Sequence, residues 1–187
     1  EYIDTNELLT VWTEGSGASV ELIEGGGDIL FTYDNTAAPN YSEITRVTPF
    51  ADFTDYELKS IDIRFVGSEE NSSEPIYVTL SDGTNSATVV AAEPVTTQAT
   101  WQTFRIAYSE FLLANGDLDL TNIATISIGV GDKNNPQAGG IGLVQFGRIT
   151  LYEARCFTPP ESDFSGDCKV GIEDLFVLSQ QWLNNNF

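Results

Sequence analysis

The chain has 187 residues, of which 41% are hydrophobic and 11% aromatic, so it is long enough to bury one sizeable core and is not disordered. It carries 28 Asp and Glu residues against eight Lys and Arg, and the resulting formal net charge of −20 disfavours nucleic acid and anionic membranes as partners. It contains no histidine, which excludes Ser–His–Asp triads and imidazole metal sites.

Most of the sequence is a series of short β-like runs separated by turn residues such as EGGGD and SDGTN. Apolar residues alternate with polar ones at Ile61, Ile63 and Phe65, as in a half-buried strand. A short helix is expected over Ser109–Ala114. The expected strands are Leu8–Trp12, Ser19–Ile23, Asp28–Asp34, Ser42–Thr48, Tyr56–Val66, Ile76–Ser81, Ala87–Ala92, Trp101–Ala107, Thr121–Val130 and Leu143–Glu153.

Many short strands without alternating helices are typical of an all-β fold, and we expect a two-sheet β-sandwich of the jelly-roll type. The sandwich should span residues 1–156, and residues 157–187 should form a linker and a short C-terminal appendage. Trp12 and Trp101 lie among apolar strand residues and are expected in the core, whereas Trp182 should dock a terminal helix. No apolar run approaches the roughly 20 residues of a membrane helix, so we expect no membrane insertion.

The segment DFSGDCKVGIED at residues 163–174 has the spacing of a calcium-binding loop. Oxygen-bearing side chains occupy its positions one, three, five and twelve, and position seven would offer a backbone carbonyl. The expected Ca²⁺ ligands are Asp163, Ser165, Asp167, Lys169 through its carbonyl, and Asp174. An amphipathic helix follows. The alternative is an acidic loop that caps this helix without a metal.

Two cysteines, Cys156 and Cys168, stand twelve residues apart at the end of the last expected strand and inside the acidic loop. We expect a disulfide that ties the C-terminal segment to the sandwich. Two free thiols in a cytosolic protein are the alternative, and two cysteines are too few ligands for zinc. A disulfide indicates an oxidising environment, so we expect a secreted or cell-surface protein.

The calcium loop and its helix resemble one repeat of a dockerin, a small calcium-binding module that attaches polysaccharide-acting proteins to cohesins. The matching residues are Asp163, Ser165, Asp167, Val170, Asp174 and Leu175. Dockerins carry two such repeats and have glycine at loop position six, where this chain has one repeat and Cys168. The resemblance implies a protein partner, either a cohesin-like chain or an identical chain.

The body of the chain resembles the galactose-binding-like carbohydrate-binding modules. The segments that carry this resemblance are FTYDNTAAPNYSE, WQTFRIAYSEF and VQFGRITLYEARC. The resemblance implies a secreted, non-catalytic module that binds a polysaccharide or another glycan.

Two loops offer the aromatic and polar side chains that a sugar site needs. The candidate residues, which could instead hold a second calcium ion, are Tyr33, Asp34, Tyr41, Glu43, Asp132 and Asn134. The alternative is that the polar residues set turns and the tyrosines pack in strands.

The sequence therefore predicts a non-enzymatic extracellular carbohydrate-binding module with a calcium-binding tail. Glycosidases use paired carboxylates, but with 28 acidic residues any pair is uninformative. The alternative function is an extracellular structural or assembly protein that associates through strand edges or the terminal helix.

Overall fold

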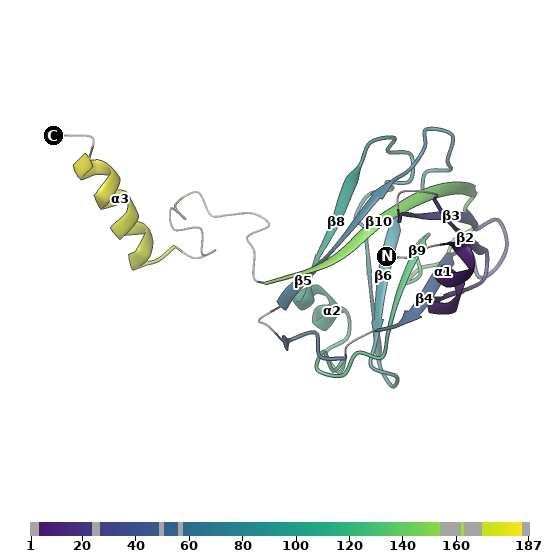
Figure 1. The fold of residues 1–187 in the computed structure, drawn as a ribbon, viewed down its shortest axis with the longest axis horizontal. Helices are drawn as coiled ribbons and strands as arrows, with labels where there is room; N and C mark the ends of the chain where they lie inside the picture. The colour runs from purple at the N-terminus through teal and green to yellow at the C-terminus, as the bar shows by residue number, and fades with distance from the viewer. Residues whose placement is uncertain are drawn as a thin grey trace.

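A computed structural model describes residues 4–23, 27–48, 51–55, 58–153, 162 and 170–184. Within them, two antiparallel five-stranded sheets face each other (Figure 1). The first sheet has the order β1 (Trp12–Glu14), β4 (Ser42–Val47), β9 (Thr125–Val130), β6 (Ile76–Ser81) and β7 (Ser86–Val90). The second has the order β2 (Ala18–Leu22), β3 (Ile29–Asp34), β10 (Ile141–Glu153), β5 (Leu58–Val66) and β8 (Gln102–Ala107).

Apolar side chains at alternate positions along the strands fill the space between the two sheets. On β5, Ile61, Ile63 and Phe65 are buried, and each is paired in register with a neighbour on β8. The rings of Phe31 and Phe146 meet edge to face with 5.6 Å between centroids. This core confirms the β-sandwich that the alternation predicted.

Three helices accompany the sheets in the described part of the chain. They are α1 (Thr5–Val11), α2 (Tyr108–Ala114) and α3 (Ile172–Asn184). Helix α2 confirms the short helix expected from the sequence, and its Tyr108 and Phe111 are buried. None of the three combines the length and hydrophobicity that a bilayer span requires.

The strand expected at Leu8–Trp12 is wrong, because residues Thr5–Val11 form a helix before β1 begins at Trp12. The side chain of Asp4 caps this helix by accepting a hydrogen bond from Glu7 N at 2.9 Å. Trp12 is buried as expected. The core position expected for Trp101 is wrong, since its side chain is 38% exposed.

Beyond Glu153, the structure describes Ser162 and residues 170–184. Helix α3 confirms a helix after the acidic loop, and its apolar side chains are exposed, including Trp182 at 68%. The linker expected at residues 158–164, except Ser162, lies outside the described residues, as do Cys156 and Cys168. The disulfide therefore stays a prediction.

Candidate functional site

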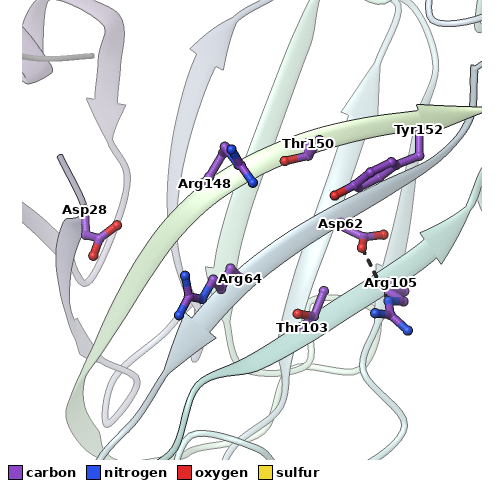
Figure 2. A pocket seen from close by; sticks show the side chains of 8 residues that line it. All are labelled: Asp28, Asp62, Arg64, Thr103, Arg105, Arg148, Thr150 and Tyr152. Carbon is purple, nitrogen blue, oxygen red and sulfur yellow. Dashed lines mark hydrogen bonds and ion pairs between the residues drawn. The ribbon is translucent and has the colours of Figure 1, made fainter. Parts of the chain in front are cut away.

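A polar groove crosses the outer face of the second sheet (Figure 2). Its volume is about 450 Å³, and its walls come from β10, β5, β8 and the residue before β3. The lining residues are Asp28, Asp62, Arg64, Thr103, Arg105, Arg148, Thr150 and Tyr152.

Strand alternation places polar side chains in this groove. On β5, the residues between the inward-facing Ile61, Ile63 and Phe65 are Asp62 and Arg64, so their side chains lie on the outer face. The antiparallel register then builds rows across the sheet. Asp62 is paired with Arg105 on β8 and with Thr150 on β10, and Arg64 is paired with Thr103.

A β-bulge in β10 adds a further arginine to the same face. Phe146 is paired with Phe65 and Ile149 with Ile63, so Gly147 and Arg148 together lie opposite the single residue Arg64. Bulges of this kind bend a strand and redirect a side chain. Arg148 thus joins Arg64 on the groove surface (Figure 2).

The glycine of the bulge, Gly147, leaves room for the Trp101 ring. A Cβ at Gly147 would lie 3.3 Å from Cζ3 of Trp101 and 3.3 Å from Oδ1 of Asp28, closer than side chains normally approach. The Trp101 ring also contacts the guanidinium of Arg64, whose Cζ lies 4.2 Å from the ring centroid. Such a cation–π contact holds the arginine in a fixed orientation.

The two carboxylates of the groove have partners within the protein. Oδ2 of Asp62 accepts a hydrogen bond from Nε of Arg105 at 3.3 Å, as an ion pair that is more buried on the aspartate side. Oδ2 of Asp28 accepts one from Nε2 of Gln145 at 2.9 Å. These contacts hold the two aspartates in place. They also occupy carboxylate oxygens that could otherwise accept hydrogen bonds from a ligand.

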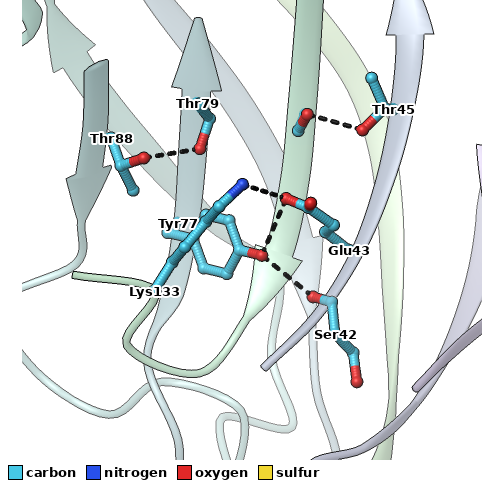
Figure 3. Close-up of polar contacts among 8 residues, drawn as sticks. Ser42, Glu43, Thr45, Tyr77, Thr79, Thr88 and Lys133 are labelled. Atoms are coloured by element: carbon cyan, nitrogen blue, oxygen red, sulfur yellow. Dashed lines mark hydrogen bonds and ion pairs between the residues drawn. The ribbon is translucent and has the colours of Figure 1, made fainter. Parts of the chain in front are cut away.

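A second polar cluster lies on the outer face of the first sheet (Figure 3). Oε2 of Glu43 accepts hydrogen bonds from Nζ of Lys133 at 2.6 Å and from the hydroxyl of Tyr77 at 3.2 Å. Lys133 Nζ also lies 5.4 Å from the ring centroid of Tyr41. Burial, with the negative charge of Glu43, raises the pKa of Tyr77 well above its usual range, so its phenol stays protonated.

The residues expected to bind sugar or a second calcium ion are divided between these surfaces and the interior. Tyr41 and Glu43 meet in the cluster on the first sheet, next to the loop that holds Asp132. Tyr33 is fully buried, and its hydroxyl donates to the carbonyl of Ser72 at 2.8 Å, so it cannot contact a ligand. Burial raises its pKa.

The remaining expected residues organise turns. Asp34 accepts hydrogen bonds from the backbone N–H and the hydroxyl of Thr36, which lower the pKa of its carboxyl. Oδ1 of Asp132 accepts from Asn134 N at 3.0 Å, and the Asn134 amide donates to the carbonyl of Thr88. These are local contacts of the kind that set loop conformation.

No group of three or more Asp, Glu or Cys side chains gathers into a metal site within the described part of the chain. Asp34 belongs to the second sheet and Glu43 to the first, where Lys133 neutralises it. Among the described residues, Asp34, Glu43 and Asp132 form no such group, so the second calcium site stays a prediction.

Of the five calcium ligands expected near the C-terminus, the structure describes one, Asp174. Asp174 is buried in the first turn of α3, and its Oδ2 accepts a hydrogen bond from Gly171 N at 2.6 Å. Asp163, Ser165, Asp167 and Lys169 lie outside the described residues. The contact fits a helix cap, and it also fits the last position of a metal loop.

One end of the sandwich contains a buried polar network. The amide of Asn35 donates to Glu74 and to the carbonyl of Val130, while its Oδ1 accepts from the Ser42 hydroxyl at 2.7 Å. Oε1 of Glu74 accepts from Gly140 N at 2.7 Å. The network joins three loops that would otherwise bury unpaired polar groups.

Sequence reasoning missed the groove. Seven of its eight lining residues, all except Asp28, lie in the strand segments SIDIRF, TFRIA and FGRITLY, where charged or hydroxyl residues alternate with apolar ones. Three arginines at outward strand positions, in a chain with eight basic residues, were a signal that could have drawn attention to this face.

Comparisons with known proteins identify the fold. A family 11 carbohydrate-binding module of the cellulosomal cellulase Lic26A-Cel5E of Clostridium thermocellum matches with a TM-score of 0.56 at 20% identity, over 82% of this chain and 94% of that one. The family 11 module from the same organism, in complex with a β-1,3-1,4-mixed-linked tetrasaccharide, matches with a TM-score of 0.56 at 19% identity, over 76% and 88%.

Part of a larger enzyme matches as well. The structure of an exo-β-agarase has a TM-score of 0.57 at 13% identity, over 83% of this chain and 24% of the agarase chain. No protein-family model and no curated protein sequence matches this chain. At these identities the likeness establishes the jelly-roll fold, and the residues of the site must carry any functional conclusion.

Proposed function

We propose that the protein is a carbohydrate-binding module that holds a polysaccharide in the groove of the second sheet. The observation that carries this proposal is a groove lined by charged and hydroxyl side chains and by the partly exposed ring of Tyr152, with the partly exposed ring of Trp101 beside it against Arg64. Aromatic faces stack on the C–H surfaces of sugar rings, and planar charged groups bind pairs of hydroxyls. The mixed-linkage tetrasaccharide bound by a protein of the same fold supports this reading.

The groove is built for binding without cleavage. Hydrolysis of a glycosidic bond requires one carboxyl group as acid and a second as base or nucleophile. Asp62 is engaged by Arg105 and Asp28 by Gln145, so both carboxylates of the groove serve to position neighbouring side chains. The protein should release no sugar from the polysaccharide that it retains.

The test is retention of the protein by a panel of polysaccharides, measured by affinity electrophoresis and quantified by calorimetry. Trp101→Ala should weaken binding to the best ligand at least tenfold. Trp182→Ala is the matched control, because it removes an exposed tryptophan from α3 outside the groove. Equal loss in both variants, or no loss in either, would contradict this location of the site.

The C-terminal segment is proposed to bind calcium. Five oxygen donors at loop spacing suit a hard cation, and Asp174 lies where the loop enters α3. Asp167→Ala should abolish calcium binding measured by calorimetry and leave the thermal unfolding of the sandwich unchanged. Unaltered calcium affinity in this variant would exclude the assignment.

We further propose that the protein acts outside the cell with Cys156 and Cys168 paired. This follows from the position of the two cysteines in the sequence and from the oxidising environment that a disulfide requires. The native protein should show no thiol that reacts with Ellman's reagent in denaturant until a reductant is added. Two reactive thiols would favour a reducing compartment.

Assembly through α3 is the second candidate function. The helix exposes a set of large apolar side chains that are typical of an interaction surface: Ile172, Leu175, Phe176, Leu178 and Trp182. Light scattering with and without a calcium chelator separates the two functions. Calcium-dependent oligomers without glycan binding would favour assembly, and a glycan-binding monomer would favour the module.

A further inference from the structure

The groove concentrates positive charge on a strongly negative protein. Three of the eight Lys and Arg residues of the chain line it, whereas the net charge of the whole chain is −20. Arg105 is neutralised by Asp62, with 3.3 Å between Nε and Oδ2. Asp28, the other carboxylate of the lining, accepts a hydrogen bond from Gln145.

Arg64 and Arg148 keep their charge unopposed. Within the described part of the chain, neither guanidinium forms an ion pair with a carboxylate. Arg64 lies over Trp101, and Arg148 extends from the bulge on the neighbouring strand. Figure 2 shows both side chains on the same surface of the sheet, with Asp28 beyond them.

Placing Arg64 and Arg148 opposite each other is a cost to the sheet. Like charges on directly opposed strand positions destabilise a sheet, and the bulge brings Arg148 opposite Arg64. One Asp or Glu at a neighbouring strand position would neutralise either arginine, and the chain has 28 such residues elsewhere. Two neighbouring guanidiniums without an ion-pair partner among the described residues are instead suited to an anionic group, because each can donate two parallel hydrogen bonds to its oxygens.

We propose that the groove selects an acidic polysaccharide, and that Arg64 and Arg148 together bind a carboxylate or sulfate group of one sugar while Trp101 or Tyr152 stacks on the ring of the same or the next sugar. This inference rests on the proposed function, since it names the chemical class of that ligand. Uronates and sulfate esters share the required chemistry, and the experiment below distinguishes them.

The net charge of the protein does not prevent this binding at physiological ionic strength. The screening length there is about 8 Å, so distant carboxylates contribute little at the groove, whereas the two guanidiniums contact the ligand directly. All measurements should therefore be made at about 0.15 M salt.

The test compares polymers that share a backbone and differ in charge. Polygalacturonate is compared with fully methyl-esterified polygalacturonate, and κ-carrageenan with chemically desulfated κ-carrageenan. We expect the acidic member of at least one pair to bind at least tenfold more tightly than its neutral counterpart. The pair that shows the difference identifies the uronate or the sulfate as the recognised group.

Arg64→Gln and Arg148→Gln should each reduce affinity for the acidic polymer about tenfold, since each removes a charge-assisted contact. Lys59→Gln is the matched control, because it removes the same charge from an exposed position that does not line the groove. Asp28→Asn should tighten binding two- to fivefold. Thermal unfolding of each variant verifies that the sandwich remains folded.

The outcomes separate this inference from the proposed function. Equal binding of both members of each pair, weakened by Trp101→Ala, would overturn the acidic specificity and leave carbohydrate binding intact. No binding to any of the four polymers, or to any member of the wider panel, would overturn both. Poly-aspartate binding as tightly as the acidic polymer would also overturn the inference, because the groove would then recognise charge without sugar.

Discussion

The guanidinium of Arg64 lies over the indole ring of Trp101, with 4.2 Å between Cζ and the ring centroid. The contact is possible because Gly147 has no side chain at the place where the indole meets β10. An exposed tryptophan is thereby fixed beside the groove, and the arginine that crosses the groove floor is fixed with it. This one contact thus holds both the indole and the guanidinium, two groups of the proposed sugar site.

Trp101→Ala should separate binding from stability. The cation–π contact contributes about 0.5–1 kcal/mol and the partial burial of the ring adds to it, so the free energy of unfolding should fall by only about 1–2 kcal/mol. Trp101→Phe keeps a ring and should retain part of the affinity. Urea unfolding and calorimetry measure the two quantities, and a loss of several kcal/mol with unchanged affinity would assign Trp101 to the core.

Glu74→Ala should destabilise the sandwich by about 2–4 kcal/mol, because it leaves one N–H of the buried Asn35 side-chain amide and the partly buried N–H of Gly140 without an acceptor. Urea unfolding measures the change. Glu69→Ala removes an exposed carboxylate from the adjoining loop and should change stability by less than about 0.5 kcal/mol. Equal effects of the two substitutions would show that the network contributes nothing specific.

Two buried tyrosines should respond to phenylalanine in opposite directions. The hydroxyl of Tyr33 donates to Ser72 O at 2.8 Å, so Tyr33→Phe should cost about 1 kcal/mol. The buried hydroxyl of Tyr108 has no hydrogen-bond partner within the described residues, and burial raises its pKa above the usual range. Tyr108→Phe should therefore be neutral or stabilise by up to about 1 kcal/mol. Thermal unfolding of both variants tests the pair, and equal destabilisation would contradict the assignment.

Asp82 should support the fold in a pH-dependent way. Its carboxylate accepts hydrogen bonds from Thr84 N, Asn85 N and Asp119 N, which lower its pKa from 3.8 to about 2. Because the folded-state pKa is the lower one, this contribution is present above pH 4 and disappears as the pH falls through 2.

Carboxyl-detected NMR titration measures this pKa directly. Asp82→Asn should lower the thermal midpoint at pH 7, and the difference from the parent protein should vanish near pH 2. A measured pKa at or above 3.8 would show that the turn between β6 and β7 does not depend on the ionised carboxylate.

The strands were predictable because short-range patterns determine them. Alternation at Ile61, Ile63 and Phe65 and turn residues such as Gly83, which has φ +90°, mark where strands run and end. The run Leu8–Trp12 was ambiguous, since its apolar residues also fit a helical face, and the cap at Asp4 decides for the helix.

The proposed binding site was not predictable in the same way. Arg64 and Arg148 are 84 residues apart and become neighbours through the pairing of β5 with β10, which the sequence does not specify. The bulge at Gly147 then decides which face Arg148 occupies. Sequence reasoning chose Tyr33 and Asp34 because they lie near other polar residues along the chain, whereas folding buries one and uses the other in a turn.

The most direct test of the central claim is an NMR titration of isotope-labelled protein with an oligosaccharide from the polysaccharide that it retains best. Amide shifts should change in one contiguous patch on the second sheet, at Asp62, Arg64, Thr103, Arg148 and Thr150. Shifts confined to the first sheet around Glu43 and Lys133 would place the ligand on the opposite face and contradict the account.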